Sequence, residues 1–483
     1  MFRGCAELEK IDDFTWRIPR QGPMRTEGIL FANETLMKGI RGDECVQQVM
    51  NVACLPGIVG PSIAMPDIHW GYGFPIGGVA AFDSREGVVS PGGVGYDINC
   101  GVRLIRTHLE EKKVRPQIRG LIEALFREIP AGVGSRRHDV RLSVADEKQV
   151  LSKGVRWAVE NGFGEAQDLE RIESHGTLPG ADPSCVSQRS LERGRDQLGT
   201  LGSGNHFLEI EVVQEIFDLN VARAFGLFEG QVVVHIHSGS RGLGYQICDD
   251  YIEVMLKAAQ KYKIDLPDRQ LCCAPLASQE AQDYLAAMSA AANYAFCNRQ
   301  LMTHFTRRAF ENFFKASPGD LGMEIVYDVA HNIAKMEDHV WKGEKKRVCV
   351  HRKGATRAFP ANHPELTAQY QSVGQPVFIP GDMGRYSYVL VGEPRAMEIA
   401  FGSCCHGAGR VMSRMKAKKA SKGRNIFREM EDRGIIVRSQ SLDGVREEIS
   451  EAYKDVADVV DVVHHAGLAR KVAKLCPMGV IKG

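Results

Sequence analysis

The chain has 483 residues, of which 44% are hydrophobic and 25% charged, an ordinary composition for a soluble globular protein. Its formal net charge of +1 creates no global field for nucleic acid, so a polyanion would need a local patch. Thirteen cysteines lack the dense, even-numbered pattern of a small secreted domain, and no run of about 18 apolar residues occurs. With no apolar signal core at the N-terminus, we expect a cytoplasmic protein without a membrane segment.

Two glycine-rich segments near the start of the chain carry polar side chains. In the first, Asp67 and His69 stand two residues apart and would share one face of an extended segment. A turn histidine bonded to backbone is the simpler interpretation of His69. The second, Pro91–Arg103, reads P-G-G-V-G-Y-D-I-N-C-G-V-R and places Asp97 and Cys100 among glycines that permit tight turns. A D-x-x-C pair alone is explained equally well by a thiol packed in the core.

The apolar pattern predicts both strands and helices along the whole chain. Strands are expected over 102–107 and 207–213, and helices over 118–129, over 278–316 with room for an interruption, and over 445–475. No internal repeat or linker divides the chain. We therefore predict an α+β protein, a single large body over residues 1–483 in which helices surround mixed β-sheets and a metal site lies at strand ends.

Three further segments place histidines where a strand begins or ends. His206 follows a glycine-rich turn, and His331 ends a β-branched run. His235 and His237 share one strand face; His237 lies at the strand end and is the better ligand, whereas His235 supports it or belongs to the core. One oxygen, one sulfur and several imidazoles suit a borderline transition metal rather than calcium or magnesium. The predicted metal ligands are Asp97, Cys100, His206, His237 and His331.

His406, in the motif C-H-G-A-G-R, is surplus to that ligand set. A thiolate can bridge two metals about 4 Å apart, and two-metal sites suit phosphoryl chemistry. A neutral imidazole is nucleophilic at pH 7, so His406 is a candidate for covalent catalysis through a phosphoramidate. The basic run over 410–424 is more simply a solvated face. The sequence contains no P-loop, no dinucleotide-binding G-x-G-x-x-G and no K-x-D-G lysine motif of ordinary nucleotidyl-transferring ligases.

Several motifs together resemble the RtcB family of RNA-splicing ligases, from about Met65 to Gly483. Besides the 91–103 motif and C-H-G-A-G-R, they are D-Q-L-G-T-L-G-S-G-N-H-F-L-E-I, H-S-G-S-R-G, D-V-A-H-N, H-R-K-G-A-T-R-A-F-P and the terminal V-I-K-G. The resemblance implies an enzyme that uses GTP and two Mn²⁺ to join RNA 3′-phosphate or 2′,3′-cyclic phosphate ends to 5′-hydroxyl ends. His406 would be the nucleophile that takes GMP, and Cys100 the bridging ligand. It leaves open tRNA splicing versus RNA repair, and whether an archease-like activator is needed.

The resemblance also assigns binding residues. Contacts to GTP are implied for Asn205, His206, Phe207, Glu209, His331, Asn332, Pro380, Gly381, Asp382, Met383, Ser387, His406, Gly407, Ala408, Gly409, Tyr453 and Lys482. Contacts to RNA are implied for Asp67, His69, Arg193, Lys353 and Arg410. Two positions depart from the family pattern: Asp382, which must be paired or turned away from phosphate, and Glu192, where some members carry a second arginine.

Manganese is assigned from the resemblance alone, because a Cys/His/Asp site binds Zn²⁺ more tightly than Mn²⁺. Two other functions remain open. A binuclear metallophosphoesterase acting on 2′,3′-cyclic phosphates could use the same ligands, but it would need neither His406 nor GTP. A non-catalytic RNA-binding or assembly subunit with structural metals would be expected to have a closed site, which the glycine-rich surroundings disfavour.

Overall fold

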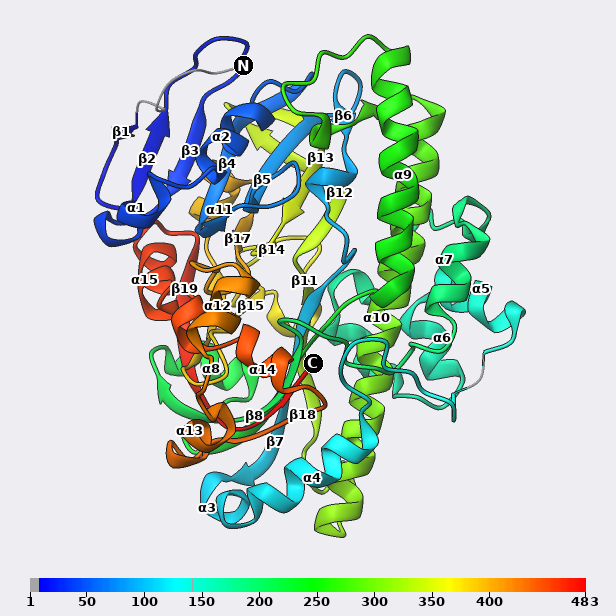
Figure 1. Ribbon diagram of the computed structural model, residues 1–483, viewed down its shortest axis with the longest axis vertical. Coiled ribbons are helices and arrows are strands. Elements are labelled where there is room, and N and C mark those ends of the chain that lie inside the picture. Colours follow the sequence, from blue (N-terminus) through cyan, green and yellow to red (C-terminus); the bar gives the residue numbers. More distant parts are fainter. Residues whose placement is uncertain (1–7, 141) are drawn as a thin grey trace.

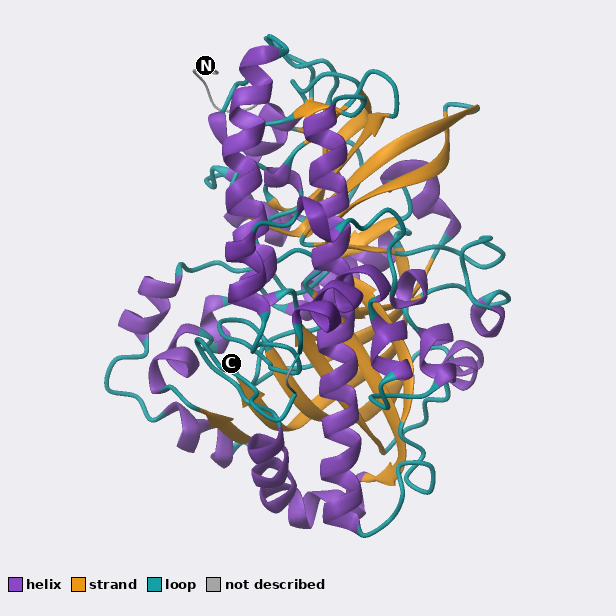
Figure 2. Ribbon diagram, turned by 90° about the vertical axis from the view of Figure 1, so that its right-hand side faces the viewer, coloured by secondary structure: helices purple, strands orange, loops and turns teal. Residues whose placement is uncertain are grey.

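The computed structural model describes residues 8–140 and 142–483, and it confirms the predicted mixture of sheets and surrounding helices. Figure 1 shows the first strands beside β12 and β13 in the upper half and the second large sheet in the lower half. Long helices run in front of the strands in Figure 2, and shorter helices lie to either side of them. The predicted absence of a signal core concerns a segment whose residues 1–7 lie outside the described part. Within that part, no helix is long and apolar enough to cross a membrane.

The seven-stranded sheet has the order β1-β2-β3-β4-β5-β13-β12. Its strands are β1 (Glu9–Lys10), β2 (Thr15–Ile18), β3 (Gly28–Phe31), β4 (Ile58–His69), β5 (Ile76–Asp83), β12 (Asn332–Trp341) and β13 (Glu344–Lys353). Short two-stranded sheets pair β6 (Val88–Val89) with β10 (Ala274–Pro275) and β14 (Ala355–Arg357) with β17 (Ser403–Cys405).

The eight-stranded sheet has the order β11-β7-β9-β8-β19-β16-β15, with β18 also paired to β19. Its strands are β7 (Gly101–Glu110), β8 (Phe207–Ile216), β9 (Gln231–Ser238), β11 (Glu324–Ala330), β15 (Pro376–Ile379), β16 (Ser387–Gly392), β18 (Ile436–Ser439) and β19 (Ala469–Lys482).

The helices fill the connections between these strands. They are α1 (Glu34–Ile40), α2 (Cys45–Val52), α3 (Glu111–Val114), α4 (Ile118–Glu128), α5 (Val144–Lys153), α6 (Val155–Glu160), α7 (Gln188–Gly194), α8 (Leu219–Phe225), α9 (Arg241–Lys261), α10 (Gln279–Phe314), α11 (Pro394–Ala400), α12 (Arg414–Ala420), α13 (Ile426–Asp432), α14 (Leu442–Glu447) and α15 (Val456–His465).

The strand register brings several chain ends to one edge of the eight-stranded sheet. In the β7–β9 pair Val102 lies opposite His237, and in the β8–β9 pair Phe207 lies opposite the same histidine. β11 pairs with β7 so that Ala330 lies opposite Gly101. Cys100 precedes Gly101, His206 precedes Phe207 and His331 follows Ala330, so the antiparallel register brings these ligands and His237 to the same edge.

The long helix α10 runs the length of the molecule without the interruption that the sequence allowed (Figures 1 and 2). Its alanine-rich surface is buried over much of its length, which lets neighbouring elements pack closely. Polar side chains on it hold loops in place. Asn298 accepts from the backbone N–H groups of Gly199 and Thr200 and donates to the carbonyl of Gly239. These loops precede His206 and follow His237, so α10 fixes the approach to the strand ends.

The predicted helix over 445–475 is wrong in two places: α14 ends at Glu447 and a short 3-10 turn (Ser450–Ala452) separates it from α15, and residues 469–475 form a strand. α15 ends at His465, and the chain then turns at Gly467, whose φ is +75°, into the long strand β19. β19 pairs with β8, β16 and β18. The local sequence pattern of residues 469–475 fits a helix or a strand. Pairing with strands distant in the sequence makes this segment a strand.

A buried ion network ties β7 and α10 to β11. The carboxylate of Asp328 accepts from Arg103 at 2.7 Å and from Arg299 at 2.8 Å, and all three side chains are fully buried. Removing the carboxylate would leave two buried guanidinium groups without their shared counter-ion.

We expect Asp328→Ala to lower the free energy of unfolding by about 3–5 kcal/mol, measured by urea unfolding. The matched control is Asp338→Ala, whose carboxylate pairs with Arg347 at 2.9 Å but is 77% exposed. The control should lose at most about 1 kcal/mol. Equal losses in the two variants would contradict the assigned role of the buried network.

Candidate metal and nucleotide site

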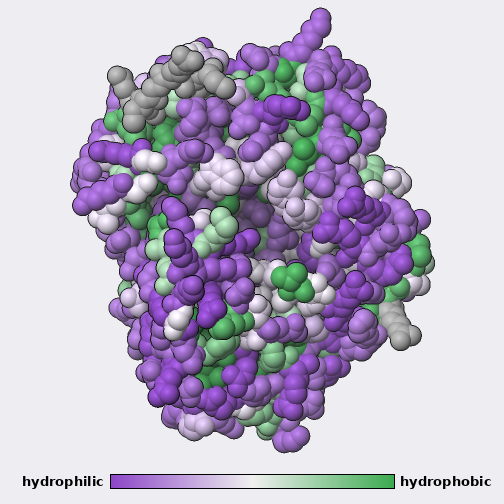
Figure 3. All heavy atoms as spheres, viewed as in Figure 1, coloured by the Kyte–Doolittle hydropathy of each residue, from purple (hydrophilic) through white to green (hydrophobic). Residues whose placement is uncertain are grey.

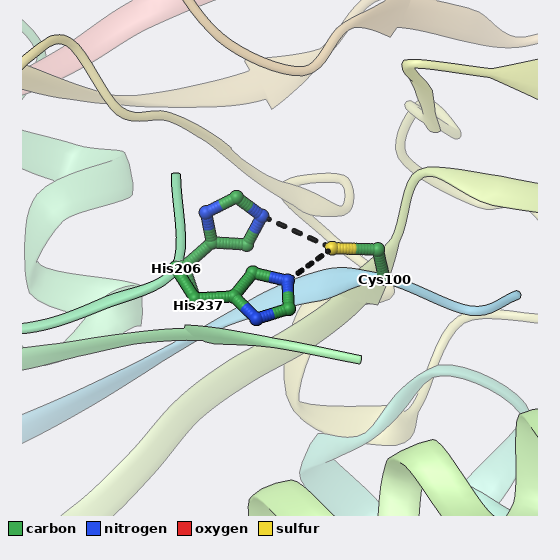
Figure 4. Close-up of side chains that lie close together, drawn as sticks. All are labelled: Cys100, His206 and His237. Atoms are coloured by element: carbon green, nitrogen blue, oxygen red, sulfur yellow. Dashed lines mark hydrogen bonds between the residues drawn. The ribbon is translucent and has the colours of Figure 1, made fainter. Parts of the chain in front are cut away.

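Cys100 lies between two histidines at the edge of the eight-stranded sheet. Its Sγ is 3.3 Å from Nε2 of His206 and 3.2 Å from Nε2 of His237. Figure 4 shows the thiol pointing at both imidazoles, each from a different segment. These three donor atoms lie within 4.8 Å of one another, the spacing expected of ligands to one ion or to a shared pair.

The other two predicted ligands extend this cluster on opposite sides. Nε2 of His206 is 2.9 Å from Oδ2 of Asp97, while Nε2 of His237 is 3.3 Å from Nε2 of His331. The second oxygen of Asp97 accepts from the backbone N–H of Ser240 at 2.9 Å, at the start of α9. The structure thus brings together all five residues that the sequence proposed as metal ligands, with Cys100 in the middle.

The protonation of these groups fits a cation. Burial lowers the pKa values of His237 and His331 well below the usual range, so both imidazoles are neutral and can offer a lone pair. Burial opposes ionisation of Asp97, but its contact with His206 brings the net pKa below the ordinary value. Burial and the charge of Asp97 raise the pKa of the Cys100 thiol, so its ionisation would require a bound cation. Sulfur, nitrogen and oxygen donors together suit a transition metal.

His406 lies next to this cluster, with its ring centroid 4.7 Å from that of His331. It follows β17, and its Nδ1 is 2.6 Å from Oδ2 of Asp67, which is buried in β4. Because the carboxylate accepts, Nδ1 carries the proton and Nε2 keeps its lone pair. The backbone N–H of His406 donates to the same oxygen at 3.2 Å. Asp67 therefore fixes both the tautomer and the direction of the ring.

Close packing behind Asp67 maintains this arrangement. Gly409 has a φ of +77°, and a Cβ there would lie 2.1 Å from the carbonyl oxygen of Asp67, so only glycine fits. Lys454 donates to the carbonyls of Pro66 and Ile68 at 2.9 and 2.6 Å, which anchors the strand on either side of Asp67.

His406 and most of the predicted metal ligands line one cavity of about 390 Å³, a size suited to a nucleotide. Figure 3 shows a hollow near the centre of the corresponding face. The predicted residues in the lining are His69, Asp97, Cys100, Asn205, Phe207, Glu209, His237, His331, Asn332, Lys353, Pro380, Gly381, Asp382, Met383, His406, Gly407, Ala408, Gly409, Arg410, Tyr453 and Lys482. Four predicted residues are not part of it: Asp67, Arg193, His206 and Ser387.

One end of the cavity combines a carboxylate, an aromatic ring and a lysine. Burial raises the pKa of Glu209 well above its ordinary value, and the neighbouring Glu211 adds to the effect. Lys482, at the end of β19, lies 5.6 Å from the ring of Phe207 and donates to the carbonyl of Asn205 at 3.2 Å. The phenol of Tyr453 donates to Glu448. A ligand that offers hydrogen-bond donors to Glu209 would relieve its unfavourable burial.

Asp382, which departs from the family pattern, is paired within the protein. Its Oδ1 accepts from the backbone N–H of Gly384 at 3.0 Å and from the hydroxyl of Ser450, and Arg385 lies 3.4 Å from Oδ2. Burial nevertheless raises its pKa, so the carboxyl is easier to protonate than usual. Both effects would reduce its repulsion of a phosphate group placed nearby.

The residues predicted to contact RNA occupy different positions. Lys353 lines the cavity, but its ammonium donates to the carbonyls of Tyr72, Phe74 and Gly92, and burial lowers its pKa to about 7. Arg410 also lines it and donates to Glu448 at 3.0 Å. Nδ1 of His69 donates to the backbone carbonyl of Asp67 at 2.9 Å. The Asp67 side chain contacts His406, and Arg193 is exposed outside the cavity beside Glu192.

Sequence reasoning missed four polar residues around the site. Glu448 and Arg414 line the cavity, Lys454 supports β4, and Arg241 lies near Asp97 with its guanidinium bonded to Thr200 and Ser135. Arg241 stands in the H-S-G-S-R-G motif, which signalled its importance. The interpretation of the basic run over 410–424 as a solvated face is wrong for Arg414, which lines the cavity. Glu448 and Lys454 stand in no motif. His235, left open as support or core, is a core histidine paired with Glu211 at 3.1 Å.

Comparison with known proteins agrees with these observations. A profile of the family described as tRNA-splicing ligase RtcB matches residues 48–483. The chain is 54% identical to the tRNA-splicing ligase RtcB of Thermococcus kodakarensis over 482 residues, covering 100% of both chains. It is 54% identical to that of Archaeoglobus fulgidus, over 99% of both, and 52% identical to that of Methanococcus maripaludis, over 99% of this chain and 100% of the relative. The chain therefore belongs to the tRNA-splicing ligase RtcB family.

Proposed function

We propose that this chain is a GTP- and Mn²⁺-dependent RNA ligase that acts in tRNA splicing, RNA repair or both. It would join a 3′-phosphate or 2′,3′-cyclic phosphate end to a 5′-hydroxyl end through GMP bound to His406. The observation that carries the proposal is the position of His406. Oδ2 of Asp67 lies 2.6 Å from Nδ1 of His406. Nε2 of His406 is therefore available in the cavity that Glu209 and most of the predicted metal ligands also line.

The proposed first step is guanylate transfer. Nε2 of His406 attacks the α-phosphorus of GTP; an N–P bond forms, and the bond to the pyrophosphate oxygen breaks. The proton on Nδ1 stays hydrogen-bonded to Asp67, and the carboxylate stabilises the positive charge that develops on the ring. Manganese ions held by Asp97, Cys100, His206, His237 and His331 would neutralise the charge on the phosphate oxygens.

RNA enters in the later steps. Water first attacks the phosphorus of a cyclic end; the bond to the 2′ oxygen breaks, and that oxygen takes a proton, which leaves a 3′-phosphate. An oxygen of that phosphate then attacks the guanylyl phosphorus, the bond to Nε2 of His406 breaks, and Nε2 recovers its lone pair. Finally the 5′-hydroxyl oxygen attacks the RNA 3′-phosphorus and gives its proton to solvent, and GMP leaves with the electron pair of the broken P–O bond.

Incubation with Mn²⁺ and GTP labelled on the α-phosphate, without RNA, tests the proposal. We expect a covalent label that is lost in acid and stable in alkali, as a phosphoramidate is. Label on the β- or γ-phosphate should not be retained. A protein that opens 2′,3′-cyclic phosphates without forming any adduct would instead be the metallophosphoesterase that shares this ligand set.

Glu209 is proposed to accept from the N1 and N2 hydrogens of guanine. Glu209→Gln replaces one acceptor by a donor, so we expect the KM for GTP in adduct formation to rise about 10–100-fold. ITP lacks the 2-amino group, and the preference for GTP over ITP should shrink in the variant. Glu215→Gln, an exposed change on the same strand, is the control. If Glu209→Gln kept the wild-type preference for GTP over ITP, a residue other than Glu209 would have to contact the guanine base.

The metal assignment has its own test. Because nitrogen and sulfur donors bind Zn²⁺ more tightly than Mn²⁺, added Zn²⁺ should displace manganese and inhibit adduct formation. Metal analysis of the protein before and after addition would follow the exchange directly. Full ligation with Zn²⁺ as the sole metal would contradict the manganese assignment.

A further inference from the structure

A single guanidinium on α10 joins the segments behind the predicted metal ligands. The side chain of Arg299 is fully buried, and all three of its nitrogens have acceptors in the protein. Nη1 donates to the backbone carbonyls of Asn99 at 2.8 Å and of Ser238 at 2.9 Å. Nε and Nη2 each donate to the carboxylate of Asp328 at 2.8 Å. One side chain therefore holds three segments that are far apart in the sequence.

Each of these three segments carries a predicted metal ligand. The first bonded residue directly precedes Cys100, the second directly follows His237, and the third lies in β11, three residues before His331. The ligand segments are also bonded to one another, because the backbone N–H of His331 donates to the carbonyl of Cys100 at 2.8 Å. A displacement of the guanidinium would therefore disturb three of the five ligands together.

Glycine at position 101 permits this close approach. A Cβ on Gly101 would lie 3.1 Å from the guanidinium carbon of Arg299 and 2.5 Å from the carbonyl oxygen of Val329. Any larger residue would push Arg299 and β11 away from the start of β7.

The backbone beside Cys100 is held in an uncommon conformation. Asn99 is left-handed, with a φ of +53°, which few residues other than glycine adopt. Its buried side chain donates from Nδ2 to the carbonyl of Ala292 on α10 at 2.7 Å. Such a conformation persists where the surroundings hold it, and here the contacts come from α10. Asp97 and Cys100, on either side of this turn, both contact Nε2 of His206.

We propose that Arg299 is a positioning residue for the metal centre, which fixes the backbone beside Cys100, His237 and His331 so that these ligands meet before a metal binds. Arg299 does not line the cavity, so it acts through the segments that it holds. Partners of this kind raise metal affinity about 10–100-fold, because they orient the ligands. The inference rests on the proposed metal-dependent function and extends it to a residue outside every recognised motif.

Metal binding to the metal-free protein measures this role. Arg299→Lys keeps a cation beside Asp328, but the donors of lysine sit on one atom and cannot reach all three segments. We expect the Kd for Mn²⁺, followed by the paramagnetic resonance signal of free Mn²⁺, to rise about 10–100-fold. The matched control is Arg307→Lys on the same helix. Arg307 pairs with the buried Asp168 at 2.8 Å and with the carbonyl of Met323 at 3.1 Å, and neither adjoins a ligand. Its Kd should equal that of the wild type.

Adduct formation separates ligand placement from general damage. In Arg299→Lys, the Mn²⁺ concentration that half-saturates labelling by GTP should rise by the same factor as the Kd, and excess Mn²⁺ should restore most of the wild-type rate. An Arg299→Lys protein that is folded by circular dichroism and binds Mn²⁺ as the wild type does would overturn the inference. Equal losses of affinity in Arg299→Lys and Arg307→Lys would also overturn it.

Two variants of Asn99 decide the matter if Arg299→Lys does not fold. Both Asn99→Gly and Asn99→Ala lose the side-chain contact with α10, but only alanine is strained in the left-handed conformation. We expect Asn99→Ala to bind Mn²⁺ about tenfold more weakly than Asn99→Gly. Wild-type affinity in both variants would reject positioning of this segment by α10.

Binding of Co²⁺ keeps this test separate from the proposed function. The cobalt–thiolate absorption band reports Cys100 as a ligand, whichever metal the reaction uses. If the wild type binds Co²⁺ but forms no adduct with Mn²⁺ and GTP, the ligase mechanism fails, while the Co²⁺ affinities of Arg299→Lys and Arg307→Lys still judge the inference. A wild type that binds neither ion would overturn it.

Discussion

His406→Ala is expected to abolish formation of the guanylate adduct and, with it, joining of RNA ends. The imidazole is the proposed site of the N–P bond, and no other histidine in the described residues combines a carboxylate on Nδ1 with a place in the cavity lining. The rate should fall to background rather than by a graded factor, because the covalent acceptor itself is removed. Labelling with α-labelled GTP, followed by gel analysis, measures this.

A matched control variant and an RNA that already carries the proposed intermediate make the result specific to His406. His138→Ala removes an exposed histidine and should label as the wild type does. An RNA that already carries guanylate on its 3′-phosphate bypasses every step before the attack of the 5′-hydroxyl, so His406→Ala should still join it to a 5′-hydroxyl end. An adduct that persists in His406→Ala would assign the nucleophile to another residue and refute the mechanism.

Asp67→Asn is expected to slow adduct formation about 10²–10⁴-fold without preventing GTP binding. Asp67 accepts from Nδ1 of His406 at 2.6 Å. An asparagine amide turned to donate would favour the tautomer with the proton on Nε2, where attack must occur. The change should therefore appear in the rate at saturating GTP rather than in the KM. This prediction also moves Asp67 from a direct RNA contact to a residue that positions the nucleophile.

The chain offers a close control for this change. Glu211 accepts from Nδ1 of His235 at 3.1 Å, in a pair that is fully buried and does not line the cavity. Glu211→Gln should change the rate at saturating GTP by no more than a few-fold. If the two variants lost rate equally, the loss would reflect general damage to buried pairs rather than the tautomer of His406.

The local predictions that succeeded rest on short-range patterns. The helix over 118–129 is α4, and the strands over 102–107 and 207–213 lie within β7 and β8. These segments show clear apolar periodicity, and the structure has nothing that overrides it. The segment 469–475 failed for the opposite reason: β19 is a strand because partners on both sides take up its backbone groups.

The sequence by itself determined which residues could do the chemistry: a thiol and a carboxylate among glycines, histidines at strand ends and one surplus histidine in a glycine-flanked turn. Only the tertiary structure decided which of them meet. His206 and Asp97 are 109 residues apart and His406 and Asp67 are 339 apart, yet each pair is in contact. Such contacts depend on strand register and on how two sheets and α10 pack, and neither is encoded in a local pattern. For the same reason no motif announced that Asp67 faces His406.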